Sequence, residues 1–145
     1  MNLAIFLGGT VGNNSWRERF IDQLVAQGID RSTIFNPVVP AGQWNDSSRN
    51  TEALAKDQAQ ILFFYIGHAY HEENTISPYS LLEAVLALVD DPDRAMVVID
   101  TAGLNNHSLE AAQACRNLLK NKFPAAPIFS TLEEALNEIV GRLMK

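Results

Sequence analysis

The sequence predicts an α/β fold: a single-domain, three-layer α/β/α sandwich around a five-stranded parallel sheet, flavodoxin/Rossmann-like, of strand order 2-1-3-4-5. Short apolar runs alternate with helical patterns from one end of the chain to the other. The composition, 47% hydrophobic and 19% charged, is that of a folded protein. The length of 145 residues suits one domain, which we expect to span residues 1–145.

The five expected strands are short runs rich in apolar residues. They are Leu3–Leu7, Thr33–Asn36, Ile61–Ile66, Ala95–Ile99 and Pro127–Phe129. The third run is apolar throughout, which is typical of a parallel strand covered on both faces. Right-handed crossovers between such strands place helices on both sides of the sheet.

The five expected helices lie between and after these strands. They are Ser15–Gln27, Arg49–Ala59, Pro78–Val89, Ser108–Lys120 and Leu132–Leu143. In the first helix, apolar residues recur at helical spacing from Trp16 to Val25, and Gly28 is placed to end it. Before the last helix, Thr131 followed by Glu134 predicts a capping box.

In sheets of this type a ligand binds beyond the carboxyl ends of the strands. The segments at those ends are Gly8–Gly12, Asn36–Ser48, Gly67–Ser77, Asp100–Asn106 and Ser130–Thr131. The second and third are long for such connections, which favours a functional role. In the first, the glycines would let a ligand approach the backbone, and the following helix N-terminus would favour an anion. We expect ligand contact there rather than only a tight turn.

Charge and cysteine content exclude several classes of function. Eleven Lys and Arg against seventeen Asp and Glu give a net charge of −6, so we expect no nucleic acid polymer as a partner. The single cysteine, Cys115, excludes an internal disulfide and a cysteine-built zinc site, and we expect it to be a buried thiol. The longest apolar run, Ile61–Ile66, is too short to cross a bilayer, and Met1–Leu7 lacks the features of a signal peptide. We therefore expect no membrane association and a cytoplasmic location.

The residues do not support a GTPase, an FMN carrier or a metal site, so we expect no cofactor and no metal. Asp100–Gly103 is similar to a phosphate-sensing motif of GTPases, but no G-x-x-x-x-G-K-[ST] loop precedes it. The first loop lacks the Ser/Thr-rich phosphate cradle of an FMN carrier. A metal cluster could be drawn from polar residues of one loop, but nothing else in the chain completes it. We expect solvated residues or a lid at these positions, which are His68, His71, Glu72 and Glu73.

The segment Thr75–Glu83 gives the clearest indication of a functional residue. Ser77 is a good N-cap and Pro78 a good first helical residue. The helix that follows is apolar all round, which predicts that it is buried, and Glu83 is the only charged residue between Glu73 and Asp90. A buried carboxylate needs either a strong partner or a cavity in which it has a task. These residues alone leave open a structural glutamate that bonds to a loop or faces a partner subunit.

Four features occur in a distinctive order over about Leu3–Leu88. They are a small-residue loop (Leu7–Thr10), a polar turn with Asn36-Pro37 and a following Trp44, an acidic residue ahead of the strand Ile61–Tyr65, and the loop and helix from Ser77 to Glu83. In the order and spacing of these features, the sequence resembles the nucleoside 2-deoxyribosyltransferase family and the related nucleoside 5′-monophosphate N-glycosidases.

The resemblance implies two catalytic residues. Glu83 matches the family nucleophile, which would attack C1′ of the sugar and form a ribosyl-enzyme ester. Glu52 matches an acidic residue that manages protons or orients the sugar, with Asp57 as its nearby competitor. The family's small Gly-containing turn before the nucleophile is replaced here by Pro78-Tyr79-Ser80, which reshapes the pocket.

The resemblance also implies a set of substrate-binding residues. Besides Asp57, these are Gly8, Gly9 and Thr10 around the sugar or base, Asn36 in the polar turn, Trp44 stacked on the base, and Ser77. Ser77 lies six residues before the nucleophile. Transferases of the family commonly have Asp there, whereas the monophosphate hydrolases have a Ser that helps hold the 5′-phosphate, so we lean towards a nucleotide substrate. The segment Thr75–Glu83 contains no arginine, and the candidates to accompany Ser77 come from elsewhere in the chain: Arg17, Arg19 and Arg49.

We therefore expect cleavage or transfer at the N-glycosidic bond of a nucleoside or nucleoside 5′-monophosphate. The alternative is a non-catalytic domain that senses a nucleotide or nucleotide-sugar with the same crevice. The partner is a small molecule in both cases. The resemblance, with an exposed route to the pocket, implies a homodimer or a higher homo-oligomer.

Overall fold

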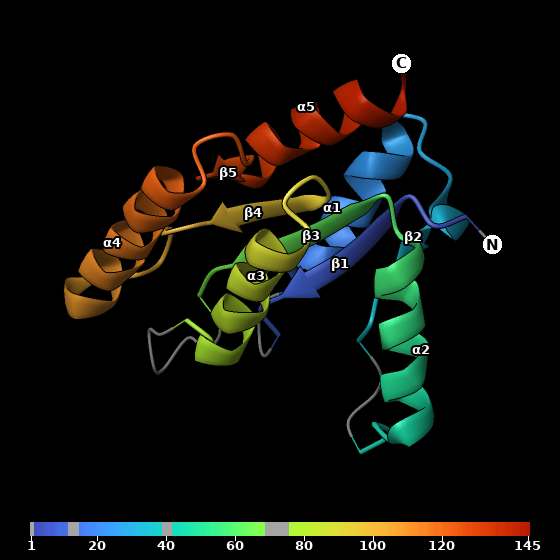
Figure 1. Cartoon of the computed structure of the whole chain (residues 1–145), viewed down its shortest axis with the longest axis horizontal. Helices are drawn as coiled ribbons and strands as arrows, with labels where there is room; N and C mark the ends of the chain where they lie inside the picture. Colours follow the sequence, from blue (N-terminus) through green and yellow to red (C-terminus); the bar gives the residue numbers. More distant parts are fainter. Residues whose placement is uncertain (1, 12–14, 39–41, 69–75) are drawn as a thin grey trace.

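The computed structural model describes residues 2–11, 15–38, 42–68 and 76–145. In this part of the chain five parallel strands form one sheet in the order β2-β1-β3-β4-β5, with helices on both faces (Figure 1). The predicted fold class and strand order are confirmed.

The strands differ from the predicted ones mainly at β1 and β2. They are β1 (Ile5–Gly9), β2 (Ile34–Phe35), β3 (Ile61–Ile66), β4 (Ala95–Ile99) and β5 (Ile128–Phe129). The prediction that Gly8 and Gly9 belong to a loop is wrong, because both are paired in register with Phe64 and Tyr65 of β3. β2 is only two residues long, because a short 3₁₀ helix occupies Arg31–Thr33 just before it.

All five predicted helices are present, with shifted ends. They are α1 (Trp16–Ala26), α2 (Asp46–Gln58), α3 (Pro78–Asp90), α4 (Asn106–Lys122) and α5 (Leu132–Leu143). α2 begins three residues before its predicted start, because Asn45 and Ser48 form a capping box that stabilises an additional turn. Gly28 follows α1 with φ +98°, and the Thr131 hydroxyl accepts the Glu134 N–H at the start of α5.

Alternate side chains of the strands divide the core into two clusters, one on each face of the sheet. α1 and α5 cover one face, where Trp16, Phe20 and Leu24 pack on Phe63 and Met96. α2, α3 and α4 cover the other face (Figure 1). The apolar side chains that lie between these three helices and the sheet include Phe6, Leu62, Phe64, Ala84, Leu88, Val97 and Leu119. Cys115 is half-buried beside this second cluster rather than fully buried as expected.

The prediction that α3 is buried all round is wrong. Its buried residues are mostly small: Ser80, Ala84, Ala87 and Leu88. On the other side, four large apolar side chains are between 51% and 72% exposed, and we call them the α3 stripe: Tyr79, Leu82, Leu86 and Val89. Their spacing of three or four residues places them along one side of the helix. Because the small residues already fill the contact with the sheet, the stripe has no partner within the described residues.

Candidate active site between α2 and α3

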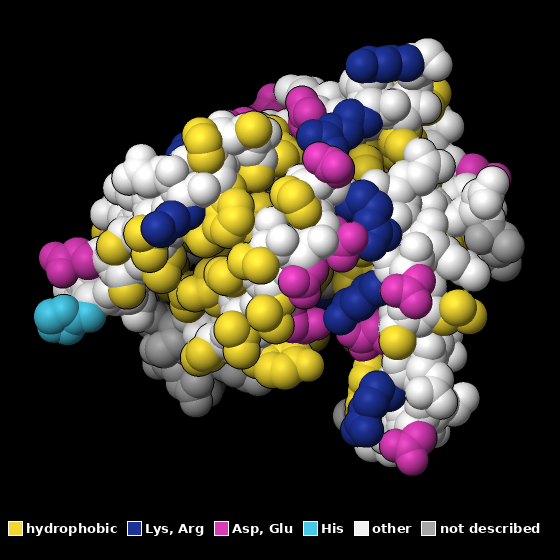
Figure 2. All heavy atoms as spheres, viewed as in Figure 1, with side chains coloured by type: hydrophobic (Ala, Val, Ile, Leu, Met, Phe, Trp, Pro, Cys, Tyr) yellow, Lys and Arg dark blue, Asp and Glu magenta, His cyan; other side chains and the backbone are white. Residues whose placement is uncertain are grey.

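A cavity of about 860 Å³ opens between α2 and α3, at the carboxyl end of β1. Figure 2 shows the hollow between these helices, with acidic and basic side chains at its edge. We call it the main cavity. Its lining comes from β1, α1, the β2–α2 connection, α2 and α3, and consists of Phe6, Gly8, Gly9, Val11, Arg17, Pro37, Val38, Gly42, Trp44, Glu52, Ser77, Tyr79, Ser80 and Glu83. This size is typical of a small-molecule site.

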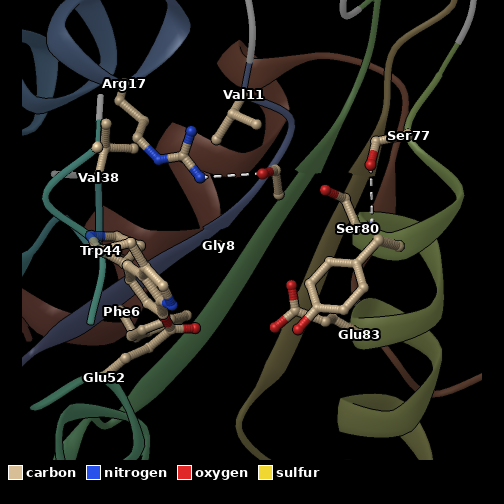
Figure 3. Close-up of a pocket in the computed structure, with 14 residues that line it drawn as sticks. Phe6, Gly8, Val11, Arg17, Val38, Trp44, Glu52, Ser77, Ser80 and Glu83 are labelled. Atoms are coloured by element: carbon tan, nitrogen blue, oxygen red, sulfur yellow. Dashed lines mark hydrogen bonds between the residues drawn. The ribbon is translucent and has the colours of Figure 1, made fainter. Parts of the chain in front are cut away.

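Glu83 projects into this cavity from the second turn of α3 (Figure 3). The helix begins as predicted, with Pro78 as its first residue and the Ser77 hydroxyl accepting the Ser80 N–H at 3.3 Å. The Glu83 side chain is 20% exposed, and Lys56 Nζ donates to its Oε2 at 2.9 Å. The carboxylate therefore has a strong ionic partner and also faces a cavity.

Lys56 links the two acidic residues of the site. Its ammonium also pairs with Glu52 Oε1 at 3.2 Å and lies 5.3 Å from the centre of the Phe6 ring. Burial by itself would lower the pKa of Lys56, but the hydrogen bond and charge of Glu83, together with those of Glu52, outweigh burial and raise it. The cation is therefore held in its charged form between two carboxylates.

Arg17 reaches the main cavity from α1, on the opposite face of the sheet. The Arg17 side chain is buried. Its guanidinium donates hydrogen bonds to three carbonyl oxygens at the end of β1. These are Leu7 O (3.4 Å), Gly9 O (3.1 Å) and Thr10 O (2.6 Å). Burial lowers the pKa of Arg17 to about 10, and the charges of Glu52 and Glu83 oppose this shift. Arg17 is therefore cationic at neutral pH and adds positive charge to an otherwise acidic site.

The two glycines of β1 are required by the packing of the strand against β3. A Cβ on Gly8 would lie 2.6 Å from the Phe64 ring. Gly9 has φ +112°, and a Cβ there would collide with the carbonyl oxygen of Tyr65. Since neither position can carry a side chain without a shift of its neighbours, this end of β1 presents backbone to the main cavity.

Several of the expected site residues lie together around the main cavity. Figure 3 shows Glu83 on one side and Trp44 with Glu52 on the other. Trp44 is 45% exposed, so its indole ring has free surface for stacking. Ser77 lines the cavity at the N-terminus of α3.

Three other expected residues are not among the described residues that line the main cavity. Thr10 is fully buried, and its hydroxyl accepts the Gly67 N–H and donates to the Gly67 carbonyl. Asn36 accepts a hydrogen bond from the Val38 N–H. Asp57 lines an adjoining cavity of about 300 Å³, which we call the side cavity.

Lys56 is a site residue that the sequence did not indicate. Of the three arginines expected as candidates beside Ser77, the described lining of the main cavity includes Arg17 and neither Arg19 nor Arg49. Glu52 and Lys56 lie four residues apart on one predicted helix, and this spacing could have predicted the ion pair between them. The contact of Lys56 with Glu83 joins residues that are 27 positions apart. Only the fold brings them together.

Neither a metal cluster nor a membrane span occurs in the part of the chain that the structure describes. Within it, no three His, Cys, Asp or Glu side chains are grouped so that they could hold a metal ion. His71, Glu72 and Glu73, together with Thr75 and Gly12, lie outside the described residues. None of the described helices combines the length and the apolar character that crossing a membrane requires.

Comparison with known families gives one match. The family model described as nucleoside 2-deoxyribosyltransferase like matches residues 2–102, a range that contains every residue named in the lining of the main cavity. No curated protein matches the chain.

Proposed function

The chain belongs to the nucleoside 2-deoxyribosyltransferase-like family, and we propose that it cleaves or transfers the N-glycosidic bond of a nucleoside or nucleoside 5′-monophosphate. Glu83 is the proposed nucleophile. One observation carries this assignment: the Glu83 carboxylate points into the main cavity, opposite Trp44 and Glu52 (Figure 3). An ionised carboxylate suits a reaction in which positive charge develops at the sugar.

The proposed reaction has two steps at C1′. In the first, a Glu83 oxygen forms a bond to C1′ while the C1′–N bond breaks, and its electron pair leaves with the base, which takes up a proton. In the second, water or another base attacks C1′ and loses a proton to the solvent, while the C1′–O bond to Glu83 breaks and its electron pair returns to the carboxylate. Glu52, paired with the Lys56 cation, accepts a hydrogen bond from a sugar hydroxyl and so orients the ring.

The distribution of side chains along the cavity supports an orientation for a nucleotide. Figure 3 shows Trp44, Phe6 and Glu52 at one end, and Arg17 and Ser77 towards the other. In our proposal the base stacks on Trp44. The 5′-phosphate lies near Ser77, where the N-terminus of α3 and the Arg17 charge favour an anion.

A panel of nucleosides and their 5′-monophosphates, analysed by chromatography for free base, tests this proposal. We expect base release by the wild-type protein and a loss of roughly 10³-fold or more in Glu83→Gln, because the nucleophile is removed. Glu138→Gln on α5 is the matched control, and its activity should not change. Near-normal turnover by Glu83→Gln would contradict the covalent role. Binding of the compounds without any release of base would favour a sensor domain.

We also propose that the chain forms a homodimer or higher homo-oligomer through the α3 stripe. Figure 2 shows hydrophobic side chains gathered over α3 and α4 on one face of the molecule, and Leu118 of α4 is 59% exposed. Exposed apolar surface of this extent is typical of interaction sites. Analytical ultracentrifugation of wild type and Leu86→Lys tests this proposal. We expect dissociation of the variant, and a wild-type monomer at high concentration would contradict it.

The cytoplasmic location is likewise a proposal. A nucleoside or nucleotide substrate is a metabolite of that compartment, and the sole cysteine, Cys115, is free. Cell fractionation with an antibody against the chain is the direct measurement.

A further inference from the structure

Lys56 and Glu83 meet in the lining of the side cavity. Glu83 lines both cavities, whereas Lys56, like Asp57 and Arg94, is found among the described residues that line the side cavity. The Lys56 ammonium contacts Glu83 Oε2 at 2.9 Å, and no hydrogen bond to Oε1 is made by any described residue. The two oxygens of the carboxylate are therefore not equivalent.

We infer that Lys56 is a positioning residue for the nucleophile: its hydrogen bond holds Oε2 of Glu83 in place, and Oε1 is left to attack C1′. This inference rests on the proposed function, in which Glu83 is the nucleophile. Lys56 does not touch the substrate and acts only through the carboxylate that it holds.

The backbone around Lys56 is held where this contact needs it. Arg94 Nη1 donates to the carbonyl oxygens of Lys56 and Ala59, both at 2.9 Å, and its Nη2 pairs with Asp91 at 2.9 Å. Asp91 is the C-cap residue that directly follows α3. One arginine therefore ties the last turn of α2 to the end of α3, and so fixes the separation across which Lys56 reaches Glu83.

The contact has a role in both steps of the proposed reaction. When Oε1 bonds to C1′, Oε2 becomes the ester carbonyl oxygen and still accepts the Lys56 N–H. When the C1′–Oε1 bond breaks, its electron pair returns to the carboxylate, and the Lys56 charge stabilises it. While Glu83 is a neutral ester, the cation is still paired with Glu52. This explains why two carboxylates share one lysine.

Steady-state kinetics of Lys56→Met, Lys56→Arg and Arg142→Met test this role with the best substrate of the panel. We expect Lys56→Met to lower kcat by roughly 10- to 100-fold, the range for a hydrogen bond to a charged group, with KM changed by less than about threefold. Lys56→Arg, which keeps the cation, should recover part of the loss. Arg142, paired with Glu138 four residues before it on α5, is the matched control. Its variant should behave like wild type.

The contact itself is measurable without turnover. NMR titration of the lysine side chains should show that the pKa of Lys56 falls in Glu83→Gln, because its main ionic partner is lost. An unchanged Lys56 pKa would overturn the inference. So would a Lys56→Met protein with wild-type kcat, or one in which only KM rises, and both would leave the proposed function intact. A wild-type protein that releases no base from any compound overturns the proposed function and this inference with it.

Discussion

The helices α1 and α2 lie on opposite faces of the sheet beside β1, and they are held in different ways. α1 buries five residues, among them Trp16, Phe20 and Leu24, and its aromatic rings pack on β3, with the Phe20 and Phe63 centroids 4.9 Å apart. α2 buries only Ala55 among its residues. Its contacts with the rest of the chain include polar ones, from Arg94 to its last turn and from Lys56 to Glu83.

This difference places the candidate site on the less tightly packed side of the molecule. α1 covers its face with apolar contact, and among its described residues Arg17 is the one that lines the main cavity. α2 stands away from α3, so Phe6 and Gly8 of β1 line the hollow instead of being covered by a helix. Apolar packing is therefore incomplete at the place where, in the proposed function, charged groups meet the ligand.

Truncation of the α1 core is the strongest test of this contrast. Phe20→Ala removes a fully buried ring that packs on Trp16 and Phe63, and we expect it to lower the free energy of unfolding by about 3–5 kcal/mol. The control on α2 is Leu54→Ala, because Leu54 is 57% exposed and should cost no more than about 0.5 kcal/mol. Urea unfolding measures both. Similar losses in the two variants would show that α2 is held by apolar packing after all.

Removal of the polar link to α2 is expected to have a smaller effect. Arg94→Met leaves the carbonyl oxygens of Lys56 and Ala59 without their donor, and we expect a loss of about 1–2 kcal/mol, since the guanidinium is partly exposed. Amide hydrogen exchange should accelerate in the last turn of α2 and not in α1. Arg142→Met, which removes a cation from α5, is the control. Equal acceleration in α1 and α2 would argue against a local role.

The sequence predicts the fold well because its signals are local. Apolar runs such as Ile61–Ile66 and caps such as Ser77 and Thr131 depend on neighbours in the chain, and the structure bears them out. The errors arise where tertiary contact decides. Gly8 and Gly9 have low strand propensity, yet their pairing with β3 makes them part of β1.

The composition of the site is harder to predict for the same reason. Glu83 is conspicuous because no other charge lies near it in the sequence, whereas nothing in the sequence distinguishes Arg17 from the other candidate arginines, Arg19 and Arg49. The burial of Arg17 depends on carbonyl groups at the end of β1, which no local pattern reveals. The α3 stripe is the reverse case. Its apolar residues look like core in the sequence, and only the packing of α3 shows that they are exposed.

Ser77→Asp tests whether the α3 side of the cavity binds a phosphate. Asp is as good an N-cap as Ser, so α3 should remain stable while a negative charge is added near the proposed phosphate. We expect the ratio of kcat/KM for a 5′-monophosphate to that for its nucleoside to fall by at least about tenfold, which corresponds to about 1.4 kcal/mol. Ser47→Asp, near the start of α2, is the matched control. The idea fails if wild type prefers the nucleoside or if Ser77→Asp leaves the ratio unchanged.

The smallest expected effect concerns the stability that Lys56 contributes through Glu83 and Glu52. Because these two carboxylates raise the pKa of Lys56 above its ordinary value of 10.5, the folded protein holds this proton more tightly than the unfolded chain. The contribution is therefore complete below about pH 10 and is lost as the pH rises through the higher folded pKa. Since the lysine side chain is one-third exposed, we expect this contribution to the free energy of unfolding to be no more than about 1 kcal/mol.

Urea unfolding at pH 8 and pH 11 should show a smaller alkaline loss of stability in Lys56→Met than in wild type. The titration of Arg17 is common to both proteins and cancels in this difference. Equal alkaline losses would mean that the carboxylates do not hold the Lys56 proton, and that α2 has no ionic link to α3.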